Sequence, residues 1–325
     1  MEIIQYQKIH QSSIVVDLHN DYLEERVHHP EHRLFSNPKH HTDLARLKEG
    51  GVNVQFFVIW TRPEEHEDHF ARAMELIDML ESDVAECKGE IEFARSYNDI
   101  ISVVNRDKIA AVLCLEGGQL IGNNIDNIDR LYKRGIRYFT LAWNYGTDWC
   151  GGAKDDDDKD LLPFGKEVID RLNKLGIMID VSHVNQKSLQ TILEYTDATV
   201  IATHSGAFRV NNHKRNLCDE HIKEIARRGG VIGSVFYPWF LNNTEHASIT
   251  DVIKHINYIR NLTGSVDHLS LGSDFDGIDI TPTGLENVSK FPNLTKALYE
   301  EGYTADEIRR ILGENALRVF RKICG

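Results

Sequence analysis

The sequence predicts an α/β fold, a (β/α)8 barrel (TIM barrel) of parallel strands with further helical segments near the C-terminal end. Eight short apolar runs alternate with helical stretches along the 325 residues. Each run is apolar almost throughout, which is typical of parallel strands covered by helices. Neither a G-x-G-x-x-G motif nor a P-loop occurs, which disfavours the alternative, an open doubly wound sheet. We therefore expect one barrel domain, residues 1–325.

The predicted strands are short runs rich in valine, isoleucine and leucine. They cover residues 14–21, 52–59, 110–115, 138–142, 177–181, 199–202, 231–235 and 269–272. The first of them ends in polar side chains, and the third continues directly into a carboxylate. This order leaves polar groups at the strand ends.

The predicted helices are stretches in which apolar residues recur at helical spacing, as Phe70, Met74, Ile77 and Leu80 do. They cover residues 43–48, 66–87, 124–134, 164–175, 186–194, 219–228, 250–262, 294–301 and 304–312. Glycines at 135 and 176 follow two of these helices, at the position that favours a C-terminal cap. The threonine at 304 and the glutamate at 307 have the spacing of a capping box.

The composition limits the classes of partner. The 50 acidic residues outnumber the 37 basic ones, so the formal net charge is −13, which disfavours nucleic acid or an anionic membrane as a partner. No apolar run approaches the roughly 18 residues of a membrane span, and residues 1–13 lack the apolar segment of a signal peptide. The five cysteines are scattered and odd in number, as in a reducing compartment. We expect a cytoplasmic protein.

Two polar segments are predicted to be solvated. Residues 151–160 contain a run of aspartates between two lysines, which is typical of a mobile loop. The other segment follows the first strand and also contains Pro30 and Pro38. Its histidines are His28, His29, His32, His40 and His41.

Ligand-type side chains stand at the ends of five predicted strands, where a barrel of this type carries its chemistry. They are His19 with Asp21, Glu116, His183, His204, and Asp274 with Asp276. The first pair is two residues apart, a spacing that places both side chains on one face of a strand. Each residue alone has an ordinary structural explanation as a core histidine, helix cap or turn former. Together they indicate a metal site, because so many ionisable groups at one barrel mouth would otherwise cost desolvation and repulsion.

The number of these groups predicts two ions. His19 and Asp21 serve one ion, His183 and His204 serve the other, and Glu116 bridges them, because imidazoles and carboxylates are typical zinc ligands. Asp274 is left free as a proton carrier. Two zinc ions about 3.5–4 Å apart share a hydroxide and polarise a carbonyl group. This arrangement predicts hydrolysis of an amide or an ester.

Six sequence motifs extend from near the N-terminus to beyond residue 277. They are Asp-Leu-His-Asn-Asp at 17–21, Leu-Glu-Gly-Gly at 115–118, Pro-Phe-Gly-Lys-Glu-Val at 163–168, Ile-Asp-Val-Ser-His-Val at 179–184, His-Ser-Gly-Ala at 204–207 with Lys-Arg-Asn at 214–216, and Gly-Ser-Asp-Phe-Asp-Gly at 272–277. In these motifs and their order the chain resembles the membrane dipeptidase (renal dipeptidase) family of zinc peptidases, within the metal-dependent amidohydrolase superfamily. The resemblance covers essentially the whole chain and is closest to bacterial-type members.

The resemblance implies a (β/α)8 barrel with the ligand assignment given above, two zinc ions, and a bridging water or hydroxide as the nucleophile. It implies that Asp274 takes a proton from this water and passes it to the leaving amine. Arg215 lies where the family places an arginine that receives the C-terminal carboxylate of the substrate, a role that suits a guanidinium fork. The resemblance also implies a homodimer.

One position departs from the mammalian members. They carry a histidine after the fourth strand, thought to hold the tetrahedral intermediate, where this chain has Trp143. Bacterial-type relatives resemble this chain here, so the departure does not predict an inactive enzyme. Trp143 offers a single N–H donor to substrate, and an apolar wall of the pocket is an equally good interpretation of it.

These observations predict a zinc-dependent dipeptidase for dipeptides with free termini, L-Xaa-D-Xaa dipeptides among them. Two alternatives stay open. One is another amidohydrolase-type activity, such as a lactonase or a phosphotriesterase, whose substrates need no arginine for a free carboxylate. The other is a non-catalytic metal-binding protein, against which the intact ligand set with Asp274 argues.

Overall fold

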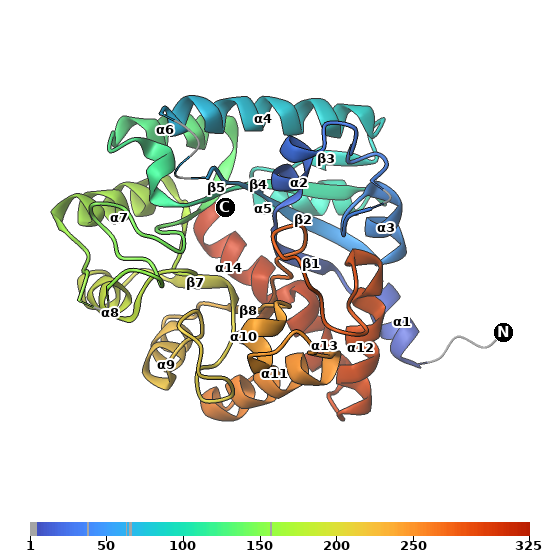
Figure 1. Cartoon of the computed structure of the whole chain (residues 1–325). Helices are drawn as coiled ribbons and strands as arrows, with labels where there is room; N and C mark the ends of the chain where they lie inside the picture. Colours follow the sequence, from blue (N-terminus) through green and yellow to red (C-terminus); the bar gives the residue numbers. More distant parts are fainter. Residues whose placement is uncertain (1–4, 38, 63, 65–66, 157) are drawn as a thin grey trace.

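Eight parallel strands form a nearly closed barrel in the computed structural model of the protein (Figure 1), which describes residues 5–37, 39–62, 64, 67–156 and 158–325. In spatial order they are β1 (Val15–Asn20), β2 (Val52–Ile59), β4 (Ile109–Glu116), β5 (Ile136–Thr140), β6 (Met178–Asp180), β7 (Val200–Ser205), β8 (Ile232–Ser234) and β9 (Leu269–Leu271). The last strand meets the first just beyond their ends, where Asp274 N donates to His19 O at 3.1 Å and Asp21 N donates to Phe275 O at 2.9 Å. The predicted barrel is confirmed.

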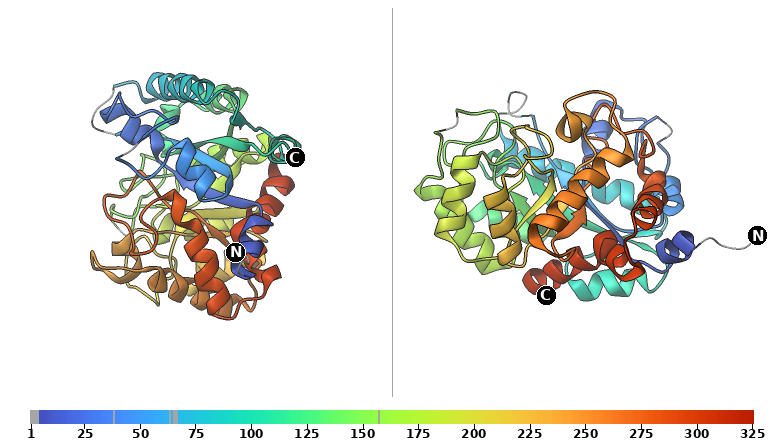
Figure 2. Two further views of the ribbon diagram at one scale, coloured as in Figure 1. Left: turned by 90° about the vertical axis from the view of Figure 1, so that its right-hand side faces the viewer. Right: turned by 90° about the horizontal axis from the view of Figure 1, so that it is seen from below.

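Helices surround the strands (Figure 2). Those that were predicted are α3 (Leu44–Glu49), α4 (His69–Glu86), α6 (Asp126–Arg134), α7 (Pro163–Leu175), α8 (Gln186–Tyr195), α9 (Asp219–Arg227), α11 (Ile249–Thr263), α12 (Phe291–Glu300) and α13 (Ala305–Arg309). The predicted first residue of α4, His66, lies outside the described residues. Gly135 and Gly176 cap α6 and α7 in the left-handed conformation, with φ of 118° and 73°. No helix in the described part of the chain is long and apolar enough to span a membrane.

Several short elements were not predicted from the sequence. They are α1 (Gln5–Gln11), α2 (Tyr22–His28), β3 (Ile91–Phe93), α5 (Tyr97–Val104), η1 (Gly118–Ile121), α10 (Pro238–Asn242), η2 (Val288–Lys290), η3 (Arg310–Glu314) and α14 (Asn315–Cys324). Strand β3 pairs with the start of β4, where Ile91 lies opposite Ile109. Strand β5 pairs with β4 further along, from Leu113 onward. Three residues are too few for their hydrophobic pattern to distinguish a strand from a loop.

The predicted end of the last helix at residue 312 is wrong. After α13 the chain makes the π-helical turn η3 and continues as α14 to Cys324. Gly313 lies in this turn, where a Cβ atom would stand only 2.1 Å from Ile14 O. The glycine therefore marks a close approach of the helix to the chain just before β1, and it does not end the helix.

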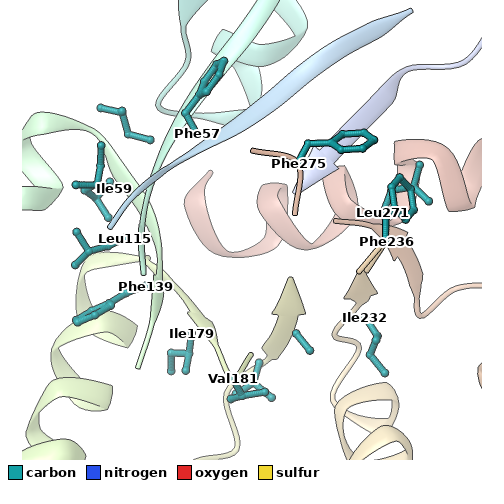
Figure 3. Packing of buried hydrophobic residues seen from close by; sticks show 14 of the residues in the cluster. Phe57, Ile59, Leu115, Phe139, Ile179, Val181, Ile232, Phe236, Leu271 and Phe275 are labelled. Carbon is teal, nitrogen blue, oxygen red and sulfur yellow. The ribbon is translucent and has the colours of Figure 1, made fainter. Parts of the chain in front are cut away.

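The outer faces of the strands pack against the helices. Figure 3 labels residues of this layer, among them Ile59 of β2, Leu115 of β4, Phe139 of β5 and Leu271 of β9. All four are fully buried or nearly so. Neighbouring residues along each strand point the other way, into the barrel, because side chains alternate between the two faces of a strand.

The barrel interior forms a second apolar cluster that α14 closes from below. Its strand residues include Val54 and Phe56 of β2 and Val112 of β4, and they pack with Val319 and Phe320 of α14. The C-terminal helix, red in Figures 1 and 2, thus covers the N-terminal ends of the strands. The opposite, C-terminal end of the barrel is left for polar groups.

Replacing Phe320 with alanine is expected to destabilise the fold by about 3–5 kcal/mol, as other buried Phe→Ala changes do. The side chain is fully buried, and its ring meets that of Phe56 edge-on at 5.9 Å. The free energy of unfolding, measured by urea titration, tests this value. Phe35→Ala is the matched control, because that ring is 50% exposed, and its change should stay below about 0.5 kcal/mol. An equal loss of unfolding free energy in the two variants would contradict the conclusion that Phe320 packs into the barrel interior.

The prediction of a solvated loop is wrong for the first part of residues 151–160. Gly152 and Ala153 are buried, and Ala153 N donates to His183 O at 2.7 Å. Asp155 holds the turn, since one of its carboxylate oxygens accepts from Gly146 N at 2.8 Å and from Gly152 N at 2.9 Å. Residue 157 lies outside the described part of the chain. Backbone hydrogen bonds thus fix this segment beside the end of β6, although its composition is that of a charged loop.

Candidate metal centre and substrate cavity

Glu116 lies at the centre of the five predicted ligands at the C-terminal end of the barrel. Its Oε1 atom is 3.0 Å from His183 Nε2, 3.5 Å from His19 Nε2 and 3.6 Å from His204 Nε2. His19 Nε2 is also 3.3 Å from Asp21 Oδ2. All five residues are buried. Glu116 belongs to two groups with the spacing of metal ligands, one with His19 and Asp21 and one with His183 and His204, and a third such group joins His19 and His204 to Asp274.

The register of two strands brings His19 and His204 into the barrel mouth. From Asp17 to Asn20 strand β1 advances three residues while β2 advances two, and β7 likewise gains one residue on β8 between Ala202 and Ser205. Such bulges interrupt the alternation of side chains and redirect one of them. Asp21 lies beyond β1, where it precedes the first residue of α2. The predicted proximity of His19 and Asp21 is thus found, although they do not share one strand face.

The hydrogen bonds of the imidazoles leave their Nε2 atoms without protons. His183 Nδ1 is 3.1 Å from Asn144 Oδ1, which accepts only. His204 Nδ1 is 2.9 Å from Thr203 Oγ1, whose own proton goes to the Asp180 carboxylate at 2.8 Å. Both histidines therefore donate from Nδ1, and each Nε2 carries a lone pair.

The two lone pairs face each other across 2.8 Å, between His183 Nε2 and His204 Nε2. His19 Nε2 and Glu116 Oε1 are also buried and have no hydrogen-bond partner among the described residues. Unpaired acceptors buried this closely repel one another unless a cation lies between them. The donor set, three imidazole nitrogens and carboxylate oxygens, is the set that zinc prefers. The residues present therefore fit a binuclear zinc centre.

The protonation of the cluster follows from its burial. Desolvation, followed by repulsion from Asp21 and Asp274, raises the pKa of Glu116 well above its usual value. Desolvation, followed by the charges of nearby cationic groups, holds the pKa of His183 and His204 well below the usual value for histidine. Neutral imidazoles are the form that binds a metal.

Residues beneath the ligands hold them in place, and sequence reasoning missed these residues. Tyr138 of β5 has its hydroxyl 2.9 Å from His19 Nδ1. Asp180 at the end of β6 accepts from Thr203 N at 2.9 Å and from Ser182 Oγ at 2.9 Å. Such partners fix the orientation of ligating side chains. The sequence could have indicated these residues in part, because a polar side chain inside an apolar strand needs a buried hydrogen-bond partner.

Replacing Tyr138 with phenylalanine is expected to weaken zinc binding by roughly 10- to 100-fold, the usual effect of losing a partner of a ligating histidine. His19 Nδ1 would keep only the Thr203 hydroxyl, 3.4 Å away. Competition with a chromophoric chelator measures the zinc affinity. Tyr132→Phe is the control, since Tyr132 lies on helix α6 and its ring packs under Arg137. Unchanged affinity in the Tyr138 variant would refute the positioning role.

Asp274 lies beside the cluster with its carboxylate toward the cavity. Its Oδ1 atom is 3.8 Å from His19 Nε2, and the residue adopts φ of 65°, which a non-glycine residue adopts only when its surroundings hold it there. Burial, and then repulsion from Asp21, raises the pKa of Asp274 to about 8. A carboxyl group of this pKa exchanges protons readily near neutral pH.

Asp276, the second carboxylate of this strand end, does not join the cluster. Its Oδ1 atom accepts from His41 N at 2.7 Å, and His41 Nδ1 in turn accepts from Asp276 N at 2.9 Å. This pair of hydrogen bonds ties the loop before α3 to the segment after β9. Asp276 is therefore a structural residue, and His41 is not solvated as predicted.

A cavity of about 930 Å³ opens above the cluster. Arg215 lines it and is 5% exposed, with the guanidinium over the Phe240 ring at 5.1 Å. Its Nη2 donates to His204 O at 3.4 Å, while its Nε has no hydrogen-bond partner among the described residues. Burial lowers the pKa of Arg215 to about 10, so the group remains cationic at neutral pH. A buried guanidinium with an unpaired N–H on a cavity wall can bind an anion.

Aromatic side chains also line the cavity, together with charged and polar ones. Trp143 packs on Trp60 with ring centroids 4.8 Å apart and stacks on His183 at 6.3 Å. Its contacts are thus those of an apolar wall, the second of the two sequence-based interpretations. His213 and Tyr237 also line the cavity, and neither was predicted, because both lie in loops whose course the sequence pattern does not reveal.

Comparison with known proteins supports the relationship that the motifs indicate. The family model of the membrane dipeptidases (peptidase family M19) matches residues 3–324. The crystal structure of the dipeptidase AC, a metallopeptidase of family M19, is 26% identical, with a TM-score of 0.90 over 97% of this chain and 99% of that one.

Two further solved structures are similar. A metallopeptidase from Rhodobacter sphaeroides, liganded with a phosphinate mimic of the dipeptide L-Ala-D-Ala, is 26% identical, with a TM-score of 0.88 over 96% of this chain and 100% of that one. The probable dipeptidase PvdM from Pseudomonas aeruginosa shares the fold, with 22% identity and a TM-score of 0.90 over 98% and 97% of the two chains. The chain therefore belongs to the membrane dipeptidase family, peptidase family M19, and is a peptidase.

Proposed function

We propose that this peptidase is a zinc-dependent dipeptidase that hydrolyses the single peptide bond of dipeptides with free termini. The observation that carries the proposal is the buried group of imidazole and carboxylate atoms around Glu116, whose lone pairs face one another. His19 and Asp21 would hold one zinc ion, His183 and His204 the other, and Glu116 both. Bound zinc supplies Lewis acidity, which lowers the pKa of water and polarises a carbonyl group.

Asp274 performs the proton transfers in this proposal. Its carboxylate lies at the edge of the cluster, 3.8 Å from His19 Nε2, and faces the cavity. It would accept the proton of the attacking water and deliver it to the amine that leaves, acting as general base and then as general acid.

Arg215 selects substrates with a free carboxylate. Its buried guanidinium lines the cavity that contains the cluster, and a carboxylate bound there would supply the missing counter-charge. The aromatic walls, Trp143, Trp60 and Phe240, exclude water and pack against side chains of the dipeptide. A lactone or a phosphotriester has no carboxylate for this arginine, so these alternatives are disfavoured.

Dipeptides with a D-residue at the C-terminal position belong to the proposed substrates. Support comes from the Rhodobacter sphaeroides relative, which holds a mimic of L-Ala-D-Ala. We place the enzyme in the cytoplasm as part of the same proposal. The five cysteines, none of them in a disulfide, support a reducing compartment.

Removing metal is expected to abolish dipeptide hydrolysis, and adding zinc back is expected to restore it. Without the cations, the Nε2 and Oε1 atoms of the cluster have nothing to bind, and no Lewis acid acts on the carbonyl group. The measurement is release of free amino acids from L-Ala-L-Ala and L-Ala-D-Ala by protein dialysed against a chelator, before and after zinc is added. Dipeptide amides serve as the control substrates, since they lack the carboxylate for Arg215. Full turnover by the chelated protein, or none by the zinc-loaded protein, would refute the proposal.

A further inference from the structure

A second group of imidazoles lies where α2 ends and the following loop begins. His29, His32 and His40 contact one another through their rings, with centroids 4.9, 5.2 and 4.5 Å apart. None of the three belongs to the described residues that line the catalytic cavity. The expectation of solvated histidines holds for His29, whose side chain is 47% exposed, and is wrong for His32, whose side chain is 5% exposed.

Two carboxylates face these rings. Glu25 Oε2 is 2.8 Å from His40 Nδ1 and 3.9 Å from His29 Nε2. Glu31 Oε1 is 3.8 Å from the other ring nitrogen of His29. Glu25 and His29 are four residues apart at the end of α2, so the helix itself places them on one face. His29 thus has a carboxylate on each side of its ring.

The closest of these contacts is not a hydrogen bond. Glu25 Oε2 is buried and has no hydrogen-bond partner among the described residues, although His40 Nδ1 lies 2.8 Å away. An orphaned carboxylate oxygen beside two ring nitrogens costs desolvation free energy unless a cation shares the space. The catalytic centre likewise contains a buried carboxylate oxygen, Glu116 Oε1, that lies beside ring nitrogens and has no hydrogen-bond partner among the described residues.

We propose that Glu25, His29 and His40 bind a divalent cation of borderline hardness, such as Zn²⁺, at a second site outside the catalytic centre. Their ligand atoms lie within 4.8 Å of one another, and two imidazoles with one carboxylate form a donor set typical of zinc. The exposed edge of His29 gives the ion a path from solvent and leaves water a coordination position. The bound ion joins the end of α2 to the loop residue His40, while Asp21 at the start of α2 belongs to the catalytic centre.

The test is the zinc content of the whole protein, measured by elemental analysis after dialysis against rising buffered concentrations of free Zn²⁺. The unsubstituted protein is expected to bind one more equivalent of zinc than His29→Gln or His40→Gln. Both changes are close to the protein surface, and circular dichroism confirms that the variants fold. His28→Gln is the matched control, because His28 neighbours His29, has a similarly exposed side chain (42%) and pairs with Glu24 instead. It should bind as much zinc as the unsubstituted protein.

Equal zinc content in all four proteins would overturn the proposal, and so would a loss of one equivalent in the His28 variant alone. Dipeptide turnover is measured on the same samples. Retained turnover with one equivalent less zinc in the His29 and His40 variants supports a separate site. Absence of turnover in every protein would refute the proposed dipeptidase activity without affecting the difference in zinc content, so the two failures are distinguishable.

Discussion

Replacing Asp274 with asparagine is expected to lower kcat for dipeptide hydrolysis by about 10²- to 10⁴-fold, the usual contribution of a positioned general acid–base group. The amide keeps the size and the polar contacts of the side chain but cannot carry the proton from the attacking water to the amine. Zinc content and KM should change little, because Asp21 and His19 remain in place. Steady-state kinetics on L-Ala-L-Ala with parallel metal analysis checks both statements.

Asp276→Asn is the matched control for Asp274→Asn. Asp276 lies two residues further on and has nearly the same backbone conformation, with φ of 68° against 65°. Its carboxylate is occupied by His41, so its replacement should leave kcat within an order of magnitude. A zinc-loaded Asp274→Asn protein with unchanged kcat would show that the proton-transfer role is wrong. A loss of zinc from that variant would assign Asp274 to the ligands instead.

Replacing Arg215 with methionine is expected to reduce kcat/KM for dipeptides by roughly 30-fold to several thousand-fold, which corresponds to the 2–5 kcal/mol cost of removing one member of a buried charge pair. Most of the loss should fall on KM, because the contact to the substrate carboxylate exists in the ground state as well as in the transition state. The Nε atom of the buried guanidinium has no hydrogen-bond partner within the described chain, which leaves it available to a substrate carboxylate in the proposed role.

The choice of substrate makes the Arg215 test specific. Hydrolysis of a dipeptide amide, which has no terminal carboxylate, should be nearly the same in Arg215→Met and in the unsubstituted protein. Arg209→Met removes an equal charge from a nearby residue whose side chain is 73% exposed and is not among the described residues that line the cavity, and it should have a much smaller effect on dipeptides. An equal loss on the amide and the dipeptide would mean that Arg215 stabilises the site and does not recognise the carboxylate.

The barrel could be predicted from the sequence because its determinants are local. Continuous apolar runs such as Val52–Ile59 appear as strands with the predicted bounds, and glycine caps end α6 and α7 where expected. The elements that were missed are short or depend on distant contacts. Gly313 is the clearest case, because its role is a close approach to Ile14, which local spacing does not encode.

The candidate site could be predicted only as a set of residue types at strand ends. The hydrogen-bond partner that orients a ligand can come from a strand far away in sequence, as Tyr138 does for His19. Such a partner depends on strand pairing, which the local sequence does not reveal. The bulge that turns His204 inward arises from the register of β7 against β8. Asp276 shows the limit of the approach, since it shares a motif with Asp274 yet binds His41.

The proposed mechanism depends on two cations bound around Glu116. Anomalous diffraction at the zinc absorption edge, from crystals of the zinc-loaded protein, tests it most directly. We expect two strong peaks at the barrel mouth, one between His19 and Asp21 and one between His183 and His204, with a Glu116 oxygen at bonding distance from each. No peak at the barrel mouth, or zinc bound there by side chains other than these five, would contradict it.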